Sequence, residues 1–241
     1  IDLTGYTRNS RSNILSFRAA PIQINYLGFP GSMGADFIDY IVADSVVIPD
    51  NQRAFYSESC IYLPDSYQPT DEDREIARTA TIRADFGLPD DAFVFCSFNN
   101  SFKINSQAFD IWMGLLRKVN DSVLWLLDTN KWAVENLRKR AAARGIDSSR
   151  IIFAERMSQA EHLARHKHAD LFIDCFNYNA HTTASDALWA GLPVVTKQGQ
   201  QFAARVAASI LTAVGLPELI TETDEDYERL ILELATNAPR L

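Results

Sequence analysis

Polar side chains that could hold an anion gather between residues 177 and 186. Thr182 and Thr183 stand where a helix would begin, directly after His181. Free backbone N–H groups and the positive end of the helix dipole favour an anion at such a position. Asp186 follows Thr182 by four residues and Thr183 by three, so these side chains can share one helical face. The pattern suits a phosphate with a sugar hydroxyl beside it, and it equally suits a helix that Thr182 or Thr183 simply caps.

Lys103 and His162 are two further candidates for ligand contacts. Lys103 follows an apolar, strand-like run, where a lysine can meet a diphosphate as a point charge. His162 lies in a segment whose helical start is marked by the capping-box pair Ser158 and Glu161. Its imidazole could stack on a base or donate to an oxygen. The alternatives are a solvated loop lysine and a surface histidine.

Arg165 lies one helical turn beyond His162, and two more histidines, His166 and His168, follow it. We expect His166 and His168 to be surface residues. Residues 30–34 form a glycine-containing loop whose backbone could approach a ligand, although a simple turn explains the loop as well.

The sequence lacks the spacings of several well-known sites. His162 and His181 have no HxxH, HExxH or CxxC partner spacing, which argues against a metal site. There is no GxSxG elbow for a hydrolase serine, no GxxxxGK[ST] loop, and no GxGxxG after the first strand of the second half. We therefore expect no metal site, no hydrolase serine elbow and no P-loop.

Apolar runs and helical patterns alternate from residue 85 onward. Predicted strands cover 93–98, 122–127, 150–153, 169–174 and 193–196, and predicted helices cover 106–116, 131–144, 159–168, 202–213 and 224–234, with a short helix between residues 182 and 190. This alternation predicts an α/β fold with a Rossmann-like, doubly wound parallel sheet. Ligands bind such sheets at the carboxyl ends of the strands, which selects the loops 99–105, 154–159 and 175–183.

The first third of the chain has a different pattern. Turn residues separate short strand candidates at 22–27, 38–44, 46–48 and 60–63, and residues 70–84 are charged and poor in apolar groups. We predict one unit over residues 1–84, which includes this linker, and a second over 85–241.

Composition limits the class of protein. The chain has 241 residues, 47% of them hydrophobic, a net charge of −8 and a pI near 5.0, which argues against a general nucleic-acid surface. The sequence contains no run of 18 apolar residues, so it predicts no membrane-spanning helix. Cys60, Cys96 and Cys175 form no CxxC and are expected to be buried thiols in a reducing, cytoplasmic setting. The chain has no initiator Met and begins like the end of a strand, so we expect a fragment.

Several motifs together resemble the O-linked N-acetylglucosamine transferases and the SPINDLY-type proteins, glycosyltransferase family 41. The resemblance runs in the same order over nearly the whole chain, in residues 5–7, 18–23, 27–34, 39–41, 98–104, 122–127, 150–153, 161–162, 181–186, 188–191 and 205–209. It implies a GT-B architecture, in which two Rossmann-like lobes hold a nucleotide sugar between them. Residues 1–84 would then end the acceptor-side lobe, and residues 85–241 would form the lobe that binds the nucleotide sugar.

The resemblance also implies a reaction and a set of contacts. The expected activity is metal-independent, inverting transfer of a sugar, N-acetylglucosamine from UDP-GlcNAc, to Ser or Thr hydroxyls of a protein. No cofactor, nucleic acid or membrane is implied. The donor contacts carried over by position are Lys103 with the leaving diphosphate, Thr182 and Thr183 with phosphate oxygens, Asp186 with the ribose, His162, Met157 and Arg165 with the uracil, His181 in the same pocket, and Gly34 with the sugar-phosphate from the first lobe.

This chain departs from the family's animal members at three donor-side positions. It has Asn100 where they have Gln, Phe102 where they have Tyr, and Gln159 where they have Lys. The loss of a lysine and a phenol should alter donor affinity and the sugar used. An O-fucosyltransferase, a transferase acting on small molecules or polysaccharides, and a non-catalytic binding module therefore stay open. The sequence names no general base, and neither the start of the first lobe nor the helical repeats common in this family are found in it.

Overall fold

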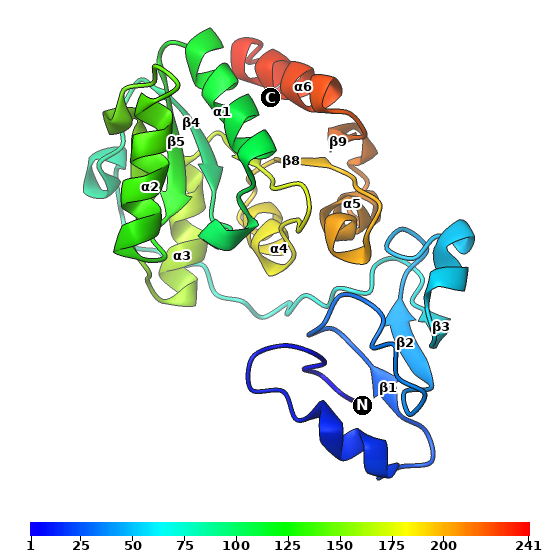
Figure 1. Ribbon diagram of the computed structural model, residues 1–241. Helices are drawn as coiled ribbons and strands as arrows, with labels where there is room; N and C mark the ends of the chain where they lie inside the picture. The colour runs from blue at the N-terminus through cyan, green and yellow to red at the C-terminus, as the bar shows by residue number, and fades with distance from the viewer.

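The computed structural model describes residues 1–241 and contains two parallel β-sheets (Figure 1). The smaller sheet has the order β1-β2-β3, with β1 at Ile24–Asn25, β2 at Tyr40–Ala43 and β3 at Ser59–Tyr62. The predicted strand at 46–48 is a turn instead. Its backbone is held by the Asp44 carboxylate, which accepts from the amides of Val46 and Val47, at 2.9 Å each.

The larger sheet has the order β6-β5-β4-β7-β8-β9, and all its pairs are parallel. Its strands are β4 (Phe93–Ser97), β5 (Ser122–Leu127), β6 (Ile151–Ala154), β7 (Leu171–Ile173), β8 (Val194–Lys197) and β9 (Ile220–Thr221). The chain runs outward from β4 to β6 and then returns to the other side of β4 with β7, so β4 and β7 flank the switch point. The predicted α/β, doubly wound fold is confirmed.

Helices connect these strands. They are α1 (Ser106–Lys118), α2 (Lys131–Ala142), α3 (Gln159–Arg165), α4 (Thr182–Trp189), α5 (Val206–Ala213) and α6 (Asp224–Thr236), with 3₁₀ helices at Ser12–Phe17, Asp50–Phe55, Arg83–Phe86, Ser101–Lys103, Ser148–Arg150, His166–His168, Phe202–Ala204 and Pro217–Leu219. Side chains of Asn105, Asn130, Ser158 and Thr223 each accept a backbone N–H at a helix start. The capping box of Ser158 and Glu161 forms as predicted.

The core lies mainly between the larger sheet and its helices. Phe109, Trp112, Met113 and Leu116 are all buried on α1, as their helical spacing predicts. Cys96 and Cys175 are buried free thiols, and Cys60 is a half-buried one.

His166 and His168 are buried, so the expectation that they are surface residues is wrong. The chain tightens into a 3₁₀ turn after α3 and points both rings inward. There His166 lies edge-on to Phe98, with ring centres 5.1 Å apart, and His168 Nε2 is 2.8 Å from Thr81 Oγ1.

The two sheets are joined by direct contacts as well as by the chain. Residues 70–82 form neither helix nor strand, and in Figure 1 they pass below α3 and α4. Beside them, Ser209 Oγ on α5 donates to Asp44 Oδ2 at 2.6 Å, and the Arg205 guanidinium donates to Val46 O, also at 2.6 Å. The rings of Tyr67 and Phe202 meet edge to face. These contacts hold the end of the smaller sheet against the start of α5.

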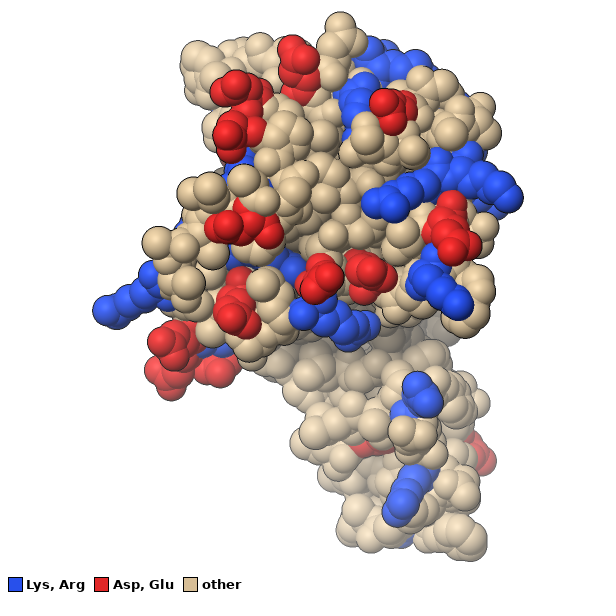
Figure 2. Space-filling model, turned by 90° about the vertical axis from the view of Figure 1, so that its left-hand side faces the viewer, with Lys and Arg blue, Asp and Glu red and all other residues tan.

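Charges of both signs are interspersed on the face seen in Figure 2, mostly over the part of the molecule built on the larger sheet. No helix reaches the length and apolar character that a membrane crossing requires.

Candidate functional site

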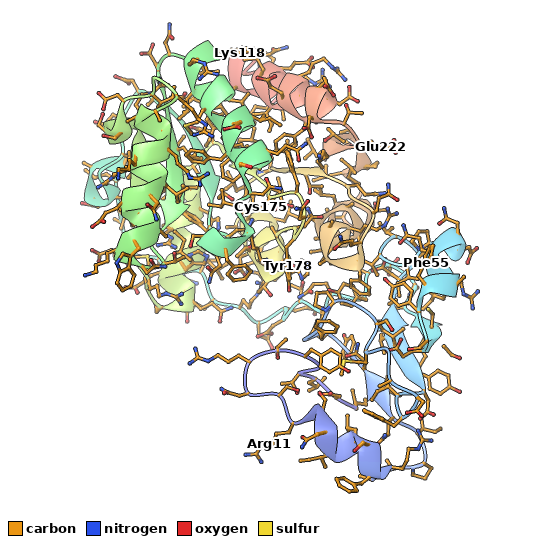
Figure 3. All side chains as sticks on the ribbon, in the orientation of Figure 1. Arg11, Phe55, Lys118, Cys175, Tyr178 and Glu222 are labelled. Atoms are coloured by element: carbon orange, nitrogen blue, oxygen red, sulfur yellow. The ribbon has the colours of Figure 1, made fainter.

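A cavity of about 320 Å³ opens at the switch point of the larger sheet, between the loops that follow β4 and β7. Open α/β sheets bind ligands at this place. Tyr178 marks the cavity in Figure 3, at the edge of the larger sheet that faces the smaller one. The lining residues come from both halves of the chain: Leu27, Gly28, Gln68, Lys103, Tyr178, His181, Thr182 and Thr183.

Lys103 reaches the cavity from the 3₁₀ turn after β4. The turn begins at Asn100, which is its N-cap and whose side chain accepts from the Phe102 amide. Lys103 Nζ donates to Asn179 O at 2.9 Å and lies 4.1 Å from the centre of the Tyr178 ring. Burial lowers the pKa of Lys103. The ammonium group is therefore partly desolvated, a state that an anionic ligand would relieve.

The start of α4 supplies backbone donors to the same cavity. The helix is preceded by His181 as N-cap, and no side chain caps it, so the alternative that Thr182 or Thr183 serves as the cap is wrong. Thr183 Oγ1 is engaged elsewhere, donating to Asn99 Oδ1 at 2.8 Å. The amides of Thr182 and Thr183 donate to no group in the chain. Two free N–H groups at a helix start, next to Lys103, are an arrangement that can hold an anion.

His181 contributes a neutral ring to this wall. Its Nε2 is 3.1 Å from Ala203 O, and the ring stacks on Tyr178 with centres 4.7 Å apart. Burial and the charge of Lys103 lower the pKa of His181 to about 3. With Nε2 donating to a carbonyl, His181 holds the loop 175–181 in place.

Asp174 is the buried anchor of that loop, and sequence reasoning missed it. Its Oδ1 accepts from Asn99 Nδ2 at 3.1 Å and from the amides of Cys175 and Ala180 at 2.7 and 2.6 Å, and its Oδ2 accepts from Thr196 Oγ1 at 2.7 Å. Burial raises the pKa of Asp174 to about 6 in spite of these bonds. The carboxylate thus fixes the backbone that carries Tyr178 and leads into α4.

His162, on α3, lies further along α4 from the cavity. Its Nδ1 is 2.5 Å from Arg165 Nη2, and its Nε2 is 4.0 Å from Asp186 Oδ2. Burial first, and then the charges of Arg165 and His166, lower the pKa of His162 to about 3. Because the guanidinium donates to Nδ1, the neutral ring carries its proton on Nε2. The side chain is 18% exposed, so this N–H remains within reach of a ligand.

Arg165 is buried under the ring system behind His162. Its guanidinium lies 4.4 Å from the Phe98 ring centre and donates to Glu155 O at 2.6 Å, and burial lowers its pKa to about 10. Met157 and Gln159 are exposed at the edge of this region. The predicted residues of α3 and α4 therefore come together, with Arg165 packed into the protein and Met157 at the surface.

Asp186 carries a partner that the sequence did not reveal. Its Oδ1 pairs with Arg74 Nη1 at 2.5 Å, and the two side chains are 10% and 6% exposed. Burial raises the pKa of Asp186 while Arg74 opposes that shift. Arg74 belongs to the charged linker, where nothing in the local sequence distinguishes it from its neighbours.

Gly34 does not line the cavity. It is exposed with a positive φ of 57°, and the glycine that lines the cavity is Gly28. A Cβ on Gly28 would lie 2.1 Å from Leu3 O, so the close chain packing there requires glycine. No group of three or more His, Cys, Asp or Glu side chains is arranged to hold a metal ion.

Comparison with known proteins gives consistent matches along the whole chain. The model of "Glycosyl transferase family 41" matches residues 1–77 and 68–241. SEC of Arabidopsis thaliana, named a probable UDP-N-acetylglucosamine–peptide N-acetylglucosaminyltransferase, is 38% identical over 100% of this chain and 25% of its own length. The similarly named SPINDLY protein of Hordeum vulgare is 30% identical over 100% of the chain and 26% of its own length. The chain thus spans about a quarter of these relatives.

A solved structure gives the same result for the fold. A mutant O-GlcNAc transferase of Thermobaculum terrenum superposes with a TM-score of 0.83 and 27% identity, over 94% of this chain and 43% of that one. The GT-B type of fold expected from the resemblance is confirmed by this superposition.

Proposed function

The chain belongs to glycosyltransferase family 41, and from this membership we propose that it binds the donor in the transfer of N-acetylglucosamine from UDP-GlcNAc to Ser or Thr hydroxyls of proteins. The relatives named above support this donor and a peptide acceptor. In this proposal residues 85–241 form the donor lobe, and residues 1–84 supply the end of the acceptor-side lobe and the linker.

The convergence of Lys103 and the start of α4 on one cavity carries the proposal. Lys103 Nζ is partly desolvated, and the amides of Thr182 and Thr183 have no acceptor in the chain. All three residues line the cavity at the switch point. A diphosphate carries the charge and the oxygen acceptors that these donors lack.

The same donors suit the chemistry of the transfer. When the bond between the sugar C1 and the diphosphate oxygen breaks, the electron pair leaves with the diphosphate. Preorganised N–H donors and an ammonium group stabilise that developing charge. The acceptor hydroxyl attacks C1 and loses its proton to a base. We propose that this step needs no metal and inverts the anomeric carbon, because Lys103 and the α4 amides can neutralise the leaving group by themselves.

The nucleoside would lie further along α4 and α3. His162 presents an N–H and an aromatic face there, with Arg165 packed behind it. Asp186 is the acceptor available to a ribose hydroxyl. The sugar would then point from the cavity toward the residues of the smaller sheet.

Titration of UDP into the full-length protein by calorimetry tests the donor site. Lys103→Ala should weaken UDP binding at least about 10-fold, because a charge-assisted contact to phosphate is lost. Lys139→Ala removes an exposed lysine from α2 and should leave binding unchanged. EDTA should have no effect on UDP affinity. Undetectable UDP binding to a folded wild-type protein would refute the proposal.

Transfer is tested separately by mass spectrometry. The full-length protein is incubated with UDP-GlcNAc and a mixture of Ser- and Thr-containing peptides, with GDP-fucose as the competing donor. Modified hydroxyls that carry N-acetylglucosamine are the expected product. Fucosylated peptides, or donor consumption without any modified peptide, would instead support the alternative transferases.

A further inference from the structure

Arg74 is an inward-pointing residue on an otherwise exposed linker. Residues 69–73, 75 and 76 are all exposed, yet the Arg74 side chain is only 6% exposed. The linker is held to α3 nearby, where the Ala77 amide donates to Ala160 O at 3.0 Å. The chain passing below α3 and α4 in Figure 1 therefore places one guanidinium against the donor lobe.

The Arg74 guanidinium makes three contacts, two of them with α4 and one within the linker. Nη1 pairs with Asp186 Oδ1 at 2.5 Å, Nε donates to Asp71 O at 3.2 Å, and the group lies 5.0 Å from the Trp189 ring centre. Trp189 Nε1 in turn donates to Arg74 O at 3.3 Å. The remaining nitrogen, Nη2, is buried and has no hydrogen-bond partner.

Unpaired polar groups cluster around this guanidinium. Asp186 Oδ2 accepts no hydrogen bond and lies 4.0 Å from His162 Nε2, whose N–H also has no acceptor within hydrogen-bond distance. Arg74 Nη2 adds a second free donor next to the same carboxylate. Arg74 Nη2 is the buried member of this set, and buried polar groups are normally paired, so two donors and one acceptor left open in one place suit a polar ligand.

A vicinal diol fits this set. Each hydroxyl of a diol both donates and accepts, so one can donate to Asp186 Oδ2 while accepting from a free N–H. Asp186 lies one helical turn beyond Thr182, which is the order of ribose and phosphate in a nucleoside diphosphate. Arg74 brings a planar fork of donors to this position.

We propose that Arg74 is a donor-binding residue that, together with Asp186, recognises the ribose diol of the nucleotide. This inference rests on the function proposed above. It assigns to the linker a direct role in binding, so that the linker closes the nucleoside end of the site when the donor is present.

The test is the discrimination between UDP and 2′-deoxy-UDP, measured by calorimetry on the full-length protein. Arg74→Ala should weaken UDP binding about 10- to 50-fold, because hydrogen bonds from a charged group are lost. The wild type should bind 2′-deoxy-UDP about 10-fold more weakly than UDP, and Arg74→Ala should reduce that ratio to less than about 3-fold. Arg74→Lys keeps the charge without the fork and should retain intermediate UDP affinity with reduced discrimination.

Arg78→Ala is the matched control, because Arg78 is exposed on the same linker and makes no hydrogen bond or ion pair. Tighter UDP binding by Arg74→Ala would show that the linker only blocks the site, and would overturn the inference. If Arg74→Ala changed neither the affinity for UDP nor the ratio between UDP and 2′-deoxy-UDP, Arg74 would only anchor the linker, and the inference would be overturned as well. If the folded wild type fails to bind UDP, the proposed function itself is wrong, and that result precedes any variant. If Arg74→Ala does not fold, Arg74→Lys decides between these outcomes.

Discussion

The two ends of the proposed donor site, called here the phosphate end (Lys103, Asp174 and the start of α4) and the nucleoside end (Arg74, His162 and Asp186), are built in different ways. At the phosphate end, the buried carboxylate of Asp174 is satisfied by four donors and fixes a loop, and the free donors of Lys103 and α4 face an open cavity. At the nucleoside end, the carboxylate of Asp186 is held by a single guanidinium that arrives from the linker. The first end is preorganised by the core of the larger sheet, whereas the second depends on Arg74, which comes from a linker without helix or strand.

This contrast has a consequence for stability and for function. A buried hydrogen-bond network is expected to contribute strongly to folding stability, because its members cannot reach water or another partner when one of them is lost. The Arg74–Asp186 ion pair is also buried, but Arg74 comes from a linker whose neighbouring residues are exposed, so its side chain can move to water when the pair is lost. We therefore expect loss of the buried Asp174 network to cost more stability than loss of the Arg74–Asp186 pair, whose removal should mainly change ligand binding.

The strongest test compares the two carboxylates directly. Asp174→Ala should lower the free energy of unfolding by about 3–5 kcal/mol, because Asn99, Thr196 and two amides lose their acceptor in the core. Asp186→Ala should cost less, about 1–3 kcal/mol, since it leaves one buried guanidinium without its carboxylate and the linker that carries Arg74 is otherwise exposed. Urea unfolding of both variants measures the difference. Equal losses would show that the two ends are built alike.

The pH dependence of stability should have opposite signs at the two ends. Burial lowers the pKa of His166, which packs behind His162, from 6.5 to about 4. The unfolded chain therefore takes up this proton first, and the contribution of His166 is present above pH 6.5 and lost as the pH falls to 4. Burial raises the pKa of Asp174 from 3.8 to about 6, so its contribution is present below pH 3.8 and lost as the pH rises to 6. Each difference between the folded and the unfolded pKa corresponds to about 3 kcal/mol in the free energy of unfolding.

Urea unfolding between pH 4 and 7 separates the two effects. The stability of the wild type relative to His166→Asn should rise with pH, and its stability relative to Asp174→Asn should fall. If both stability differences changed in the same direction across this range, the assignment of a lowered pKa to His166 and a raised pKa to Asp174 would be wrong.

The succession of strands and helices along the chain, the loops at the carboxyl ends of the strands and the buried face of α1 follow from local patterns, so the sequence predicts them. Apolar runs and helical spacing are short-range signals, and Phe109, Trp112 and Met113 lie where their spacing puts them. The same signals bring Lys103, His162 and the start of α4 to neighbouring places, because parallel strands end on one edge of a sheet.

The interaction partners of these residues are distant in the sequence, so local patterns could not predict them. Arg74 meets Asp186 across 112 residues, and Thr183 gives its hydroxyl to Asn99 across 84 residues instead of capping α4. The burial of His166 and His168 likewise depends on Phe98 and Phe86, which come from other elements. Which polar group pairs with which is decided by tertiary packing, and composition and periodicity carry no information about it.

Thr183 tests whether preorganisation of the phosphate end matters for binding. Thr183→Val removes the hydroxyl that donates to the buried Asn99, so it should cost about 1 kcal/mol of stability and weaken UDP binding several-fold. Thr183→Ser keeps the hydroxyl and should resemble the wild type. Thr182→Val changes an exposed hydroxyl with no partner in the chain and should leave stability unchanged. Identical effects of the two valine variants on stability, measured by urea unfolding, would argue against this role of Thr183.

The smallest expected effect concerns the anchoring of the linker. Trp189→Ala removes the ring beside the Arg74 guanidinium and the N–H that donates to Arg74 O, interactions worth about 0.5–1 kcal/mol. Trypsin should then cut the linker at the exposed Arg78 about two- to fivefold faster, because the segment leaves α4 more often. Trp132→Ala, which removes an exposed tryptophan from α2, should not change the rate. UDP should slow cleavage of the wild type, since a ligand held by Arg74 and Asp186 keeps the linker closed. If the cleavage rate responds neither to Trp189→Ala nor to UDP, the nucleoside end is as rigid as the phosphate end, and the difference between the two regions disappears.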